Sequence, residues 1–289
     1  MQSQLAVNPP EAAQPGAAPA LWIERAFTLA TECQLHDMPE QAKNLYLRIL
    51  EQQPDHVLAL HNLGIIAGEA GDTEARLVLF ERAVALDPGR PVFHSSLGSA
   101  LRAAGDPGRA RAEYQLALGL DPNCVDALYN FGNLLGDSEL LGEAIACFEK
   151  VLAFQPSHTD ARNNLGNLYK SRGRLAEAAA CFERVIQDHP DHFRAYANLA
   201  GIVRDLGDVR RAEALLRRAI QLAPDHAHLR SNLGDLLFRT NRLGEAIESY
   251  EDAIRLAPEV AEFHIALGCC YGARAVMRKL GTPRAGGWP

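Results

Sequence analysis

Seven prolines recur along this chain at a constant spacing of 34 residues. They are Pro54, Pro88, Pro122, Pro156, Pro190, Pro224 and Pro258. A fixed period of this length is typical of an array of stacked helical repeats, and an ordinary globular fold does not impose it. Such an array offers a long surface instead of a single cleft, so the spacing predicts a binding function along that surface.

We take each repeat to end two residues after its proline. Three further positions then carry the same type of side chain in nearly every repeat. Position 20 is alanine in six of the seven repeats. Position 8 is always small: Ala30, Gly64, Gly98, Gly132, Gly166, Ala200, Gly234 and Gly268. Position 24 is large: Tyr46, Phe80, Tyr114, Phe148, Phe182, Leu216 and Tyr250. Glycine within a helix costs about 1 kcal/mol relative to alanine, so its recurrence predicts two closely packed helices, with the small sites receiving large side chains.

A turn separates the small position from the aromatic position in each repeat. It reads Gly71-Asp72, Gly105-Asp106 and Gly207-Asp208 in three repeats. The glycine supplies a left-handed residue after one helix, and the aspartate caps the next helix. Asn241 takes the glycine place in the seventh repeat, where its side chain tolerates a positive φ. The repeat proline ends the second helix because it lacks a backbone N–H, so each repeat is predicted to be a helix–turn–helix.

This set of small, aromatic and proline positions resembles the tetratricopeptide repeat (TPR) family, from about Leu21 to Tyr271. The resemblance implies an all-α fold, a right-handed superhelix in which the first helix of each repeat lines a concave groove. We expect seven full repeats within residues 21–258, in the phase 23–56, 57–90, 91–124, 125–158, 159–192, 193–226 and 227–260. A capping helix is expected at 259–280, with a disordered leader at 1–20 and a flexible tail at 281–289.

Position 6 of the first helix is asparagine in five repeats and is the main candidate for function. These residues are Asn62, Asn130, Asn164, Asn198 and Asn232, while Ser96 interrupts the row. Helix propensity disfavours asparagine, and a carboxamide can pair with both the N–H and the C=O of a passing peptide. An extended peptide advances about 3.3 Å per residue and packed helices lie about 8–10 Å apart. One asparagine would therefore meet about every third peptide residue.

Three polar neighbours, Asn133, Asn167 and Asp235, complete the predicted peptide-binding set. The row resembles the asparagine ladder in the TPR arm of O-GlcNAc transferases, which holds substrate polypeptide. The resemblance implies a non-catalytic protein- or peptide-binding scaffold using its concave groove. The alternative is the substrate-recognition arm of an O-GlcNAc transferase-like glycosyltransferase that lacks its catalytic domain. A third possibility is an assembly protein that associates with itself.

The asparagines also have a structural interpretation, in which they bridge neighbouring repeats and satisfy buried backbone groups. A carboxylate clamp, another use of this repeat, is disfavoured. Asn163, His228 and Asn232 stand where that clamp would need Lys, Lys and Arg, and a carboxylate is best held by charged donors.

Composition excludes several other classes of function. The net charge is −7, with 36 acidic and 29 basic residues, so nucleic-acid binding is not expected. No charge-free apolar stretch of about 18 residues is present, so no membrane span is expected, and the N-terminus does not read as a secretory signal. The six cysteines form no CxxC pair and read as free thiols of a reducing, cytoplasmic compartment.

The ten histidines do not form a predicted metal site. His56, His158, His192 and His226 share position 34, just after the proline. Residues one repeat apart cannot converge on a single ion at about 2 Å. Nucleotide-binding and nucleophile motifs are missing from the sequence. We therefore expect no metal, no cofactor and no catalytic residue, and a protein or extended peptide as partner; the sequence does not specify an oligomeric state.

Overall fold

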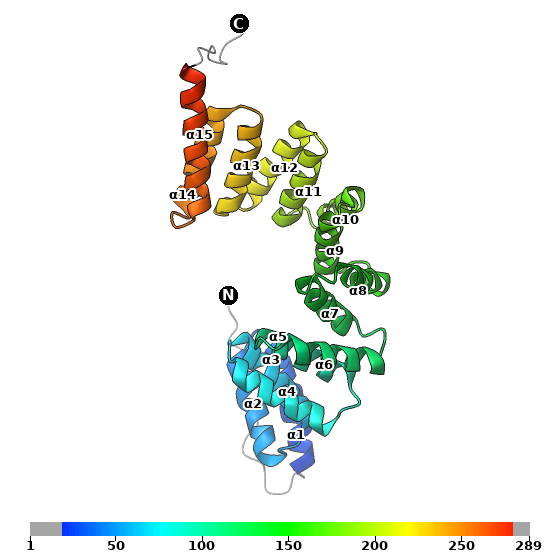
Figure 1. The fold of residues 1–289 in the computed structure, drawn as a ribbon. Helices are drawn as coiled ribbons and strands as arrows, with labels where there is room; N and C mark the ends of the chain where they lie inside the picture. Colours follow the sequence, from blue (N-terminus) through cyan, green and yellow to red (C-terminus); the bar gives the residue numbers. More distant parts are fainter. Residues whose placement is uncertain (1–18, 280–289) are drawn as a thin grey trace. The chain divides into compact units, whose positions relative to one another are not determined.

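The computed structural model describes residues 19–279, which are folded into α-helices joined by short turns (Figure 1). Two compact units divide the chain between Leu140 and Leu141. The predicted fourth repeat, residues 125–158, contributes its first helix to unit one and its second helix to unit two. By sequence position, the odd-numbered helices are the first helices of the predicted repeats and the even-numbered helices are the second.

Unit one contains seven helices in the described part of the chain. They are α1 (Pro19–Leu35), α2 (Pro39–Gln52), α3 (Val57–Glu69), α4 (Thr73–Leu86), α5 (Pro91–Ala103), α6 (Pro107–Leu120) and α7 (Val125–Asp137). Each helix packs against the next one in the chain, and α5 also contacts α7. The first helices of the third and fourth repeats, α5 and α7, are therefore neighbours, as stacked helix pairs require.

Unit two contains eight helices in the described part of the chain. They are α8 (Leu141–Phe154), α9 (Thr159–Ser171), α10 (Leu175–Asp188), α11 (Phe193–Asp205), α12 (Val209–Leu222), α13 (Ala227–Arg239), α14 (Leu243–Leu256) and α15 (Ala261–Lys279). Each packs against the next, and α9 contacts α11 while α13 contacts α15. The stacking scheme of unit one is thus repeated here.

In four of the helix pairs the core contains an aromatic ring laid on a glycine, at Gly64, Gly98, Gly166 and Gly234, as the small and large positions predict. Phe80 and Phe182 are almost completely buried, and their rings lie directly over Gly64 and Gly166. Ala178, the position-20 alanine on the same helix as Phe182, is fully buried. Without a Cβ at position 8 the ring approaches the backbone of the first helix, which gives the dense packing of a protein interior.

The predicted turns are confirmed at Gly71 and Asn241, whose φ angles are 79° and 63°. Asp72 follows the first of them and accepts a hydrogen bond of 2.9 Å from the backbone N–H of Ala75. This bond satisfies one of the free donors at the start of α4. The turn therefore ends one helix and starts the next within two residues.

Two kinds of side-chain hydrogen bond that were not predicted from the sequence stabilise the turns between repeats. The position-34 imidazoles of His56, His158 and His192 cap the following first helix, each by accepting a backbone N–H through Nδ1. Position 4 of the first helix donates back to the carbonyl of the repeat proline, as His94 does to Pro88 at 2.9 Å. These bonds satisfy backbone groups that the proline turn leaves unpaired.

The ends of the described region differ slightly from expectation. Helix α1 begins at Pro19, inside the predicted leader, and α15 ends at Lys279, close to the predicted end of the capping helix. The rest of the predicted leader, residues 1–18, and the predicted tail, residues 281–289, lie outside the described residues. Among the helices of residues 19–279, none has the length and apolar character needed to cross a bilayer.

Candidate functional site: the first-helix faces

The first helices of unit two, α9, α11 and α13, each carry an asparagine at repeat position 6. Asn164 and Asn198 are half-buried, and Asn232 is exposed. Each of these asparagines is the sixth residue of its helix. Because stacked repeats place equivalent positions side by side, we expect these carboxamides to face the same side of unit two. We name this surface the first-helix face of unit two.

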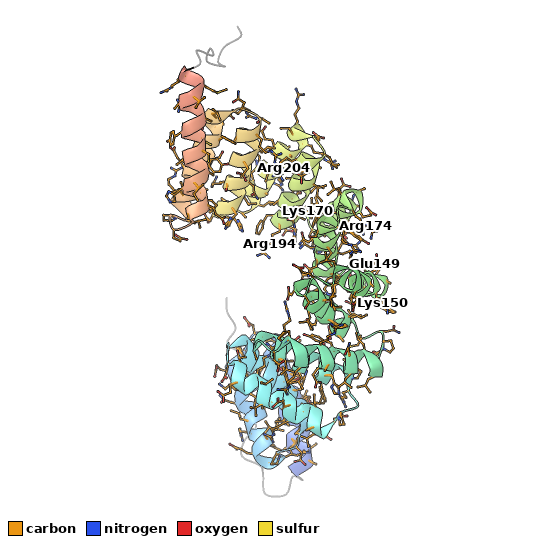
Figure 2. All side chains as sticks on the ribbon, viewed as in Figure 1. Glu149, Lys150, Lys170, Arg174, Arg194 and Arg204 are labelled. Atoms are coloured by element: carbon orange, nitrogen blue, oxygen red, sulfur yellow. The ribbon has the colours of Figure 1, made fainter. Side chains whose placement is uncertain are left out.

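Three cations lie on α9 and α11, which also carry Asn164 and Asn198. Lys170, Arg194 and Arg204 are gathered beside α9 and α11, apart from Lys150 and Arg174, which lie by α8 and α10 (Figure 2). The Lys170 ammonium reaches from α9 across α11, because a Cβ built on Gly201 would be 3.4 Å from its Nζ. The missing side chain at Gly201 therefore makes room for a lysine beside the asparagine row.

The charge of the first helices differs between the two units. In α9, α11 and α13 the cations are Arg162, Lys170, Arg194, Arg204, Arg230 and Arg239, and the anions are Asp160, Asp205 and Asp235. In α3, α5 and α7 the only cation is Arg102, and the anions are Glu69, Asp126 and Asp137. The first helices of unit two are thus net positive in a chain whose formal net charge is −7.

Some of the charges in unit two are already paired. Arg204 Nε donates to Asp205 Oδ1 at 3.0 Å, and the Tyr250 hydroxyl donates to Asp235 Oδ1 at 2.5 Å. The pKa of Tyr250 is raised, mainly because the hydroxyl is buried and secondly because of this hydrogen bond to Asp235. The predicted site residue Asp235 therefore has a structural partner, although its side chain stays exposed.

The remaining predicted residues of unit two lie on α9. Asn167, at position 9, is exposed, one helical turn after Asn164. Asn163, next to Asn164, has a buried Oδ1 without a hydrogen-bond partner among the described residues. An unpaired buried acceptor is unusual, and it adds a polar group to the same first helix.

Asn62 in unit one has a different environment, because its carboxamide bonds within the protein. Its Nδ2 donates to the hydroxyl of Tyr46 at 2.9 Å, and its Oδ1 lies 3.4 Å from Nδ1 of His61. Tyr46, on α2, is fully buried and donates to Gln34 Oε1 at 2.7 Å. At this position the bridging interpretation of the asparagine holds, because Asn62 links the first and second repeats.

The same hydrogen-bond chain continues into the third repeat through a buried histidine. His61 Nε2 lies 2.9 Å from Oγ of Ser96 on α5, and burial lowers the pKa of His61. With its proton on Nδ1, the neutral ring donates to Asn62 and accepts from Ser96. Ser96, which replaces asparagine in the third repeat, thus serves the same chain of polar contacts.

Asn130 and Asn133 share α7 and are both half-buried. They lie three residues apart, so they occupy one face of that helix. Within unit one the structure therefore places Asn62, Ser96 and Asn130 on the successive first helices α3, α5 and α7, with Asn62 and Ser96 engaged in internal bonds.

The described residues offer no cluster of metal-binding side chains. No group of three or more His, Cys, Asp or Glu side chains within residues 19–279 is arranged to hold a metal ion. The six cysteines are unpaired, and burial raises the pKa of Cys147 and Cys181, which favours the neutral thiol. Their sulfurs thus act as small apolar groups.

A hollow of about 380 Å³ lies between α12, α13 and α14 in unit two. Its charged lining includes Arg217, Glu245 and Asp252. These groups are largely paired with neighbours, Arg217 with Glu213 at 2.8 Å and Asp252 with Arg230 at 3.8 Å. Because several of its charged groups already have ion-pair partners, this hollow is a weaker candidate for a charged ligand than the first-helix face.

The grouping of Lys170 and Arg194 with Arg204 was not predicted from the sequence. Lys170 and Arg204 both stand at position 12 of their repeats, one 34-residue step apart. That spacing was the available signal, because equal repeat positions share one face.

Comparison with known proteins identifies the repeat. The family model described as "Tetratricopeptide repeat" matches six overlapping segments: residues 35–91, 77–123, 95–159, 129–191, 163–227 and 202–261. A comparison with curated protein sequences finds no significant match.

Solved structures of other TPR proteins share the fold. YrrB, described as a TPR protein with an unusual peptide-binding site, is 22% identical with a TM-score of 0.54, over 65% of this chain and 96% of its own. Pseudomonas aeruginosa pilF is 20% identical with a TM-score of 0.64, over 72% and 95% of the two chains. A TPR protein from Parabacteroides merdae is 19% identical with a TM-score of 0.63, over 86% and 98%.

These matches confirm the predicted all-α class and the solenoid architecture of stacked helix pairs. The family model covers the chain from residue 35 to residue 261, in agreement with helices α2 to α14. The chain therefore belongs to the tetratricopeptide repeat family.

Proposed function

We propose that the protein is a non-catalytic scaffold whose first-helix face of unit two binds an extended, acidic segment of another protein. The TPR fold is that of a protein-binding scaffold, and YrrB, which shares the fold, is described as having a peptide-binding site. The observation that carries the proposal is the coincidence of Asn164, Asn198 and Asn232 with Lys170 and Arg194 on adjacent first helices.

The asparagines supply contacts that do not depend on the peptide sequence. A carboxamide offers one acceptor and two donors, so each can pair with the N–H and C=O of one peptide unit. The half-buried position of Asn198 limits its rotamers, which reduces the entropy lost when it engages a ligand.

The cations supply the preference for acidic side chains. Lys170 lies over Gly201, three residues after Asn198, and Arg194 lies about one helical turn before Asn198 on α11. Bonds between such cations and carboxylates are charge-assisted and about twice as strong as neutral ones. A carboxylate at every third residue of the peptide would match the repeat spacing, given the rise of about 3.3 Å per residue of an extended chain.

Unit one contributes less to this function in our proposal. Asn62 and Ser96 are committed to the hydrogen-bond chain that joins Tyr46, His61 and the second and third repeats. We propose that Asn130, Asn133, Asn164, Asn167, Asn198, Asn232 and Asp235 remain the peptide-binding candidates, and that Asn62 is structural.

The test is a binding titration with a defined peptide. A fluorescein-labelled peptide of twelve residues, with Asp at every third position and Ser, Thr or Val at the others, is titrated with the full chain and followed by anisotropy. The double variant Asn198→Ala/Asn232→Ala should bind the peptide at least ten-fold more weakly, because the hydrogen bonding lost at each asparagine is worth about 1 kcal/mol of binding free energy. The single variant Asn44→Ala, on the exposed surface of α2, is the matched control and should bind like the wild type.

The thermal transition of each variant completes the test. The proposal requires that the double variant melts within about 2 °C of the wild type, because exposed or half-buried side chains without internal bonds contribute little stability. A double variant with normal peptide affinity, or one that loses affinity only in proportion to its loss of folded protein, contradicts the proposal.

A further inference from the structure

Gly268 on α15 lacks the neighbour that its counterparts have. A Cβ built on Gly64, Gly98, Gly166 or Gly234 would lie 2.6, 2.7, 2.8 or 2.9 Å from the ring of Phe80, Tyr114, Phe182 or Tyr250. Those four glycines are buried, whereas Gly268 is exposed. No described atom outside its own helix lies within 4 Å of a Cβ built at Gly268. Helix α15 therefore carries a ring-binding site of the repeat that no described ring fills.

The side chains around Gly268 are apolar and uncovered. Tyr271, at position 11, is 46% exposed, whereas the equivalent Leu135 and Leu237 are 1% exposed. Ile265, three residues before Gly268, is 66% exposed. Helix α15 lies at the edge of unit two with α13 and α14 to one side of it (Figure 1). Large apolar side chains exposed together on one helix mark an interaction surface.

An acidic group with a defined role in the repeat lies beside this surface. In two repeats, the glutamate that directly follows the buried ring accepts a hydrogen bond from an arginine. That arginine lies on the second helix of the following repeat. Glu81 accepts from Arg109 at 2.8 Å, and Glu183 accepts from Arg211 at 2.6 Å. Glu251 is the corresponding residue of α14, is exposed, and accepts the Tyr271 hydroxyl at 2.8 Å.

We propose that Ile265, Gly268, Tyr271 and Glu251 form a docking site, which we name the open socket, for an amphipathic helix of a different protein. The helix carries an aromatic residue that rests on Gly268. It has alanine four residues before that ring, a small or branched residue three residues after it, and arginine five residues before it to pair with Glu251. Helix α6 shows the same pattern in Arg109, Ala110, Tyr114 and Ala117. The partner helix would pack on α15 as each second helix packs on the first helix of its repeat.

A second copy of this chain does not supply that helix. The rings of the described second helices, Tyr46, Phe80, Tyr114, Phe148, Phe182 and Tyr250, are all at most 2% exposed. A second copy would have to unpack one of them to fill the socket. A helix from another protein requires no such cost, and binding of an amphipathic helix in an apolar groove is a common mode of recognition.

The experiment uses a labelled peptide with the sequence of residues 107–120, PGRARAEYQLALGL, capped at both ends. We expect it to bind the full chain in a fluorescence anisotropy titration. Replacing its tyrosine by alanine should weaken binding at least ten-fold, and replacing the arginine five residues before the tyrosine by glutamine should weaken it several-fold. Equal affinity of the wild-type and alanine peptides overturns the proposal.

Two variants of the protein localise the binding. Gly268→Leu fills the socket without a clash, because the space there is open, and should reduce affinity at least ten-fold with a melting temperature no lower than that of the wild type. Glu251→Gln should reduce the affinity for the unchanged peptide. It should not change the affinity for the peptide in which glutamine replaces the arginine five residues before the tyrosine. Retained affinity in Gly268→Leu overturns the proposal. This outcome is independent of peptide binding at the first-helix face of unit two.

The other possible occupants give distinct results. If the chain's own segment 280–289 covers the socket, a chain ending at Lys279 will bind the peptide at least ten-fold more tightly than the full chain. If a second copy covers it, light scattering will show a concentration-dependent dimer that Gly268→Leu abolishes. Either result overturns the assignment to a partner helix.

Discussion

A Cβ atom added to Gly64 would lie 2.6 Å from Cε1 of Phe80. The ring of the second helix thus rests on the bare backbone of the first, and the contact recurs at Gly98, Gly166 and Gly234. This relationship explains why a residue that weakens helices stands in the middle of so many first helices: the gain in ring packing offsets the cost of about 1 kcal/mol per glycine.

Gly64→Ala should therefore destabilise the protein, although alanine is the better helix former. The added methyl group has to displace a buried ring, and overpacking of this kind costs about 1–3 kcal/mol. Gly268→Ala is the matched control and should be neutral or stabilising by up to about 1 kcal/mol, because nothing described lies near that position. Urea unfolding of both variants gives the two changes; equal effects would contradict the ring contact.

Asn62→Ala should lower the free energy of unfolding by about 1–2 kcal/mol. The substitution removes a donor to the buried Tyr46 hydroxyl and an acceptor for His61, and such losses cost about 1 kcal/mol each. Asn198→Ala should stay within about 0.5 kcal/mol of the wild type, as ordinary surface changes do. If the two variants are equally stable, the structural role of Asn62 is wrong.

His61 should make stability depend on pH below about 6.5. Burial lowers the pKa of the folded imidazole below that of the unfolded chain, so the unfolded state binds more protons as the pH falls through the unfolded value. The contribution is fully present above that value and is lost progressively as the pH falls toward the folded pKa. Urea unfolding at pH 7.5 and pH 5.5 should show a larger drop for the wild type than for His61→Gln. An identical drop in both proteins would show that His61 is not the cause.

Much of this fold could be predicted from the sequence because repetition multiplies weak signals. A single Gly-Asp pair is poor evidence for a turn, but Gly71-Asp72 recurs in phase with Gly105-Asp106 and Gly207-Asp208, and each has the predicted φ and cap. The partners of individual polar side chains could not be predicted in the same way. Asn62 and Asn232 share a repeat position, yet Asn62 bonds to a buried tyrosine while Asn232 is exposed.

The difference between those two asparagines lies in residues other than themselves. Asn62 has a tyrosine of the preceding repeat within reach and a histidine beside it. The preceding repeat of Asn232 has Leu216 at the tyrosine position, which offers no hydroxyl. The role of a repeated polar residue therefore depends on its neighbour one repeat earlier, which a position-by-position interpretation overlooks.

Lys170→Glu should weaken binding of the acidic peptide at least ten-fold at low salt and remove part of its salt dependence. The lysine lies over α11 beside the asparagine row, where reversal of its charge places a carboxylate against the peptide carboxylates. Lys150→Glu makes the same change by α8, apart from that face (Figure 2). Similar losses in both variants would indicate that only the overall charge matters.

The most direct measurement is a map of where an extended acidic peptide touches the protein. The Asp-containing peptide, carrying benzoylphenylalanine at its centre, is irradiated with the full chain, and the cross-linked residues are identified by mass spectrometry. Cross-links should fall on α9, α11 and α13, close to Asn198, Gly201 and Arg204. Cross-links confined to the second helices α10, α12 and α14 would contradict the proposed binding face.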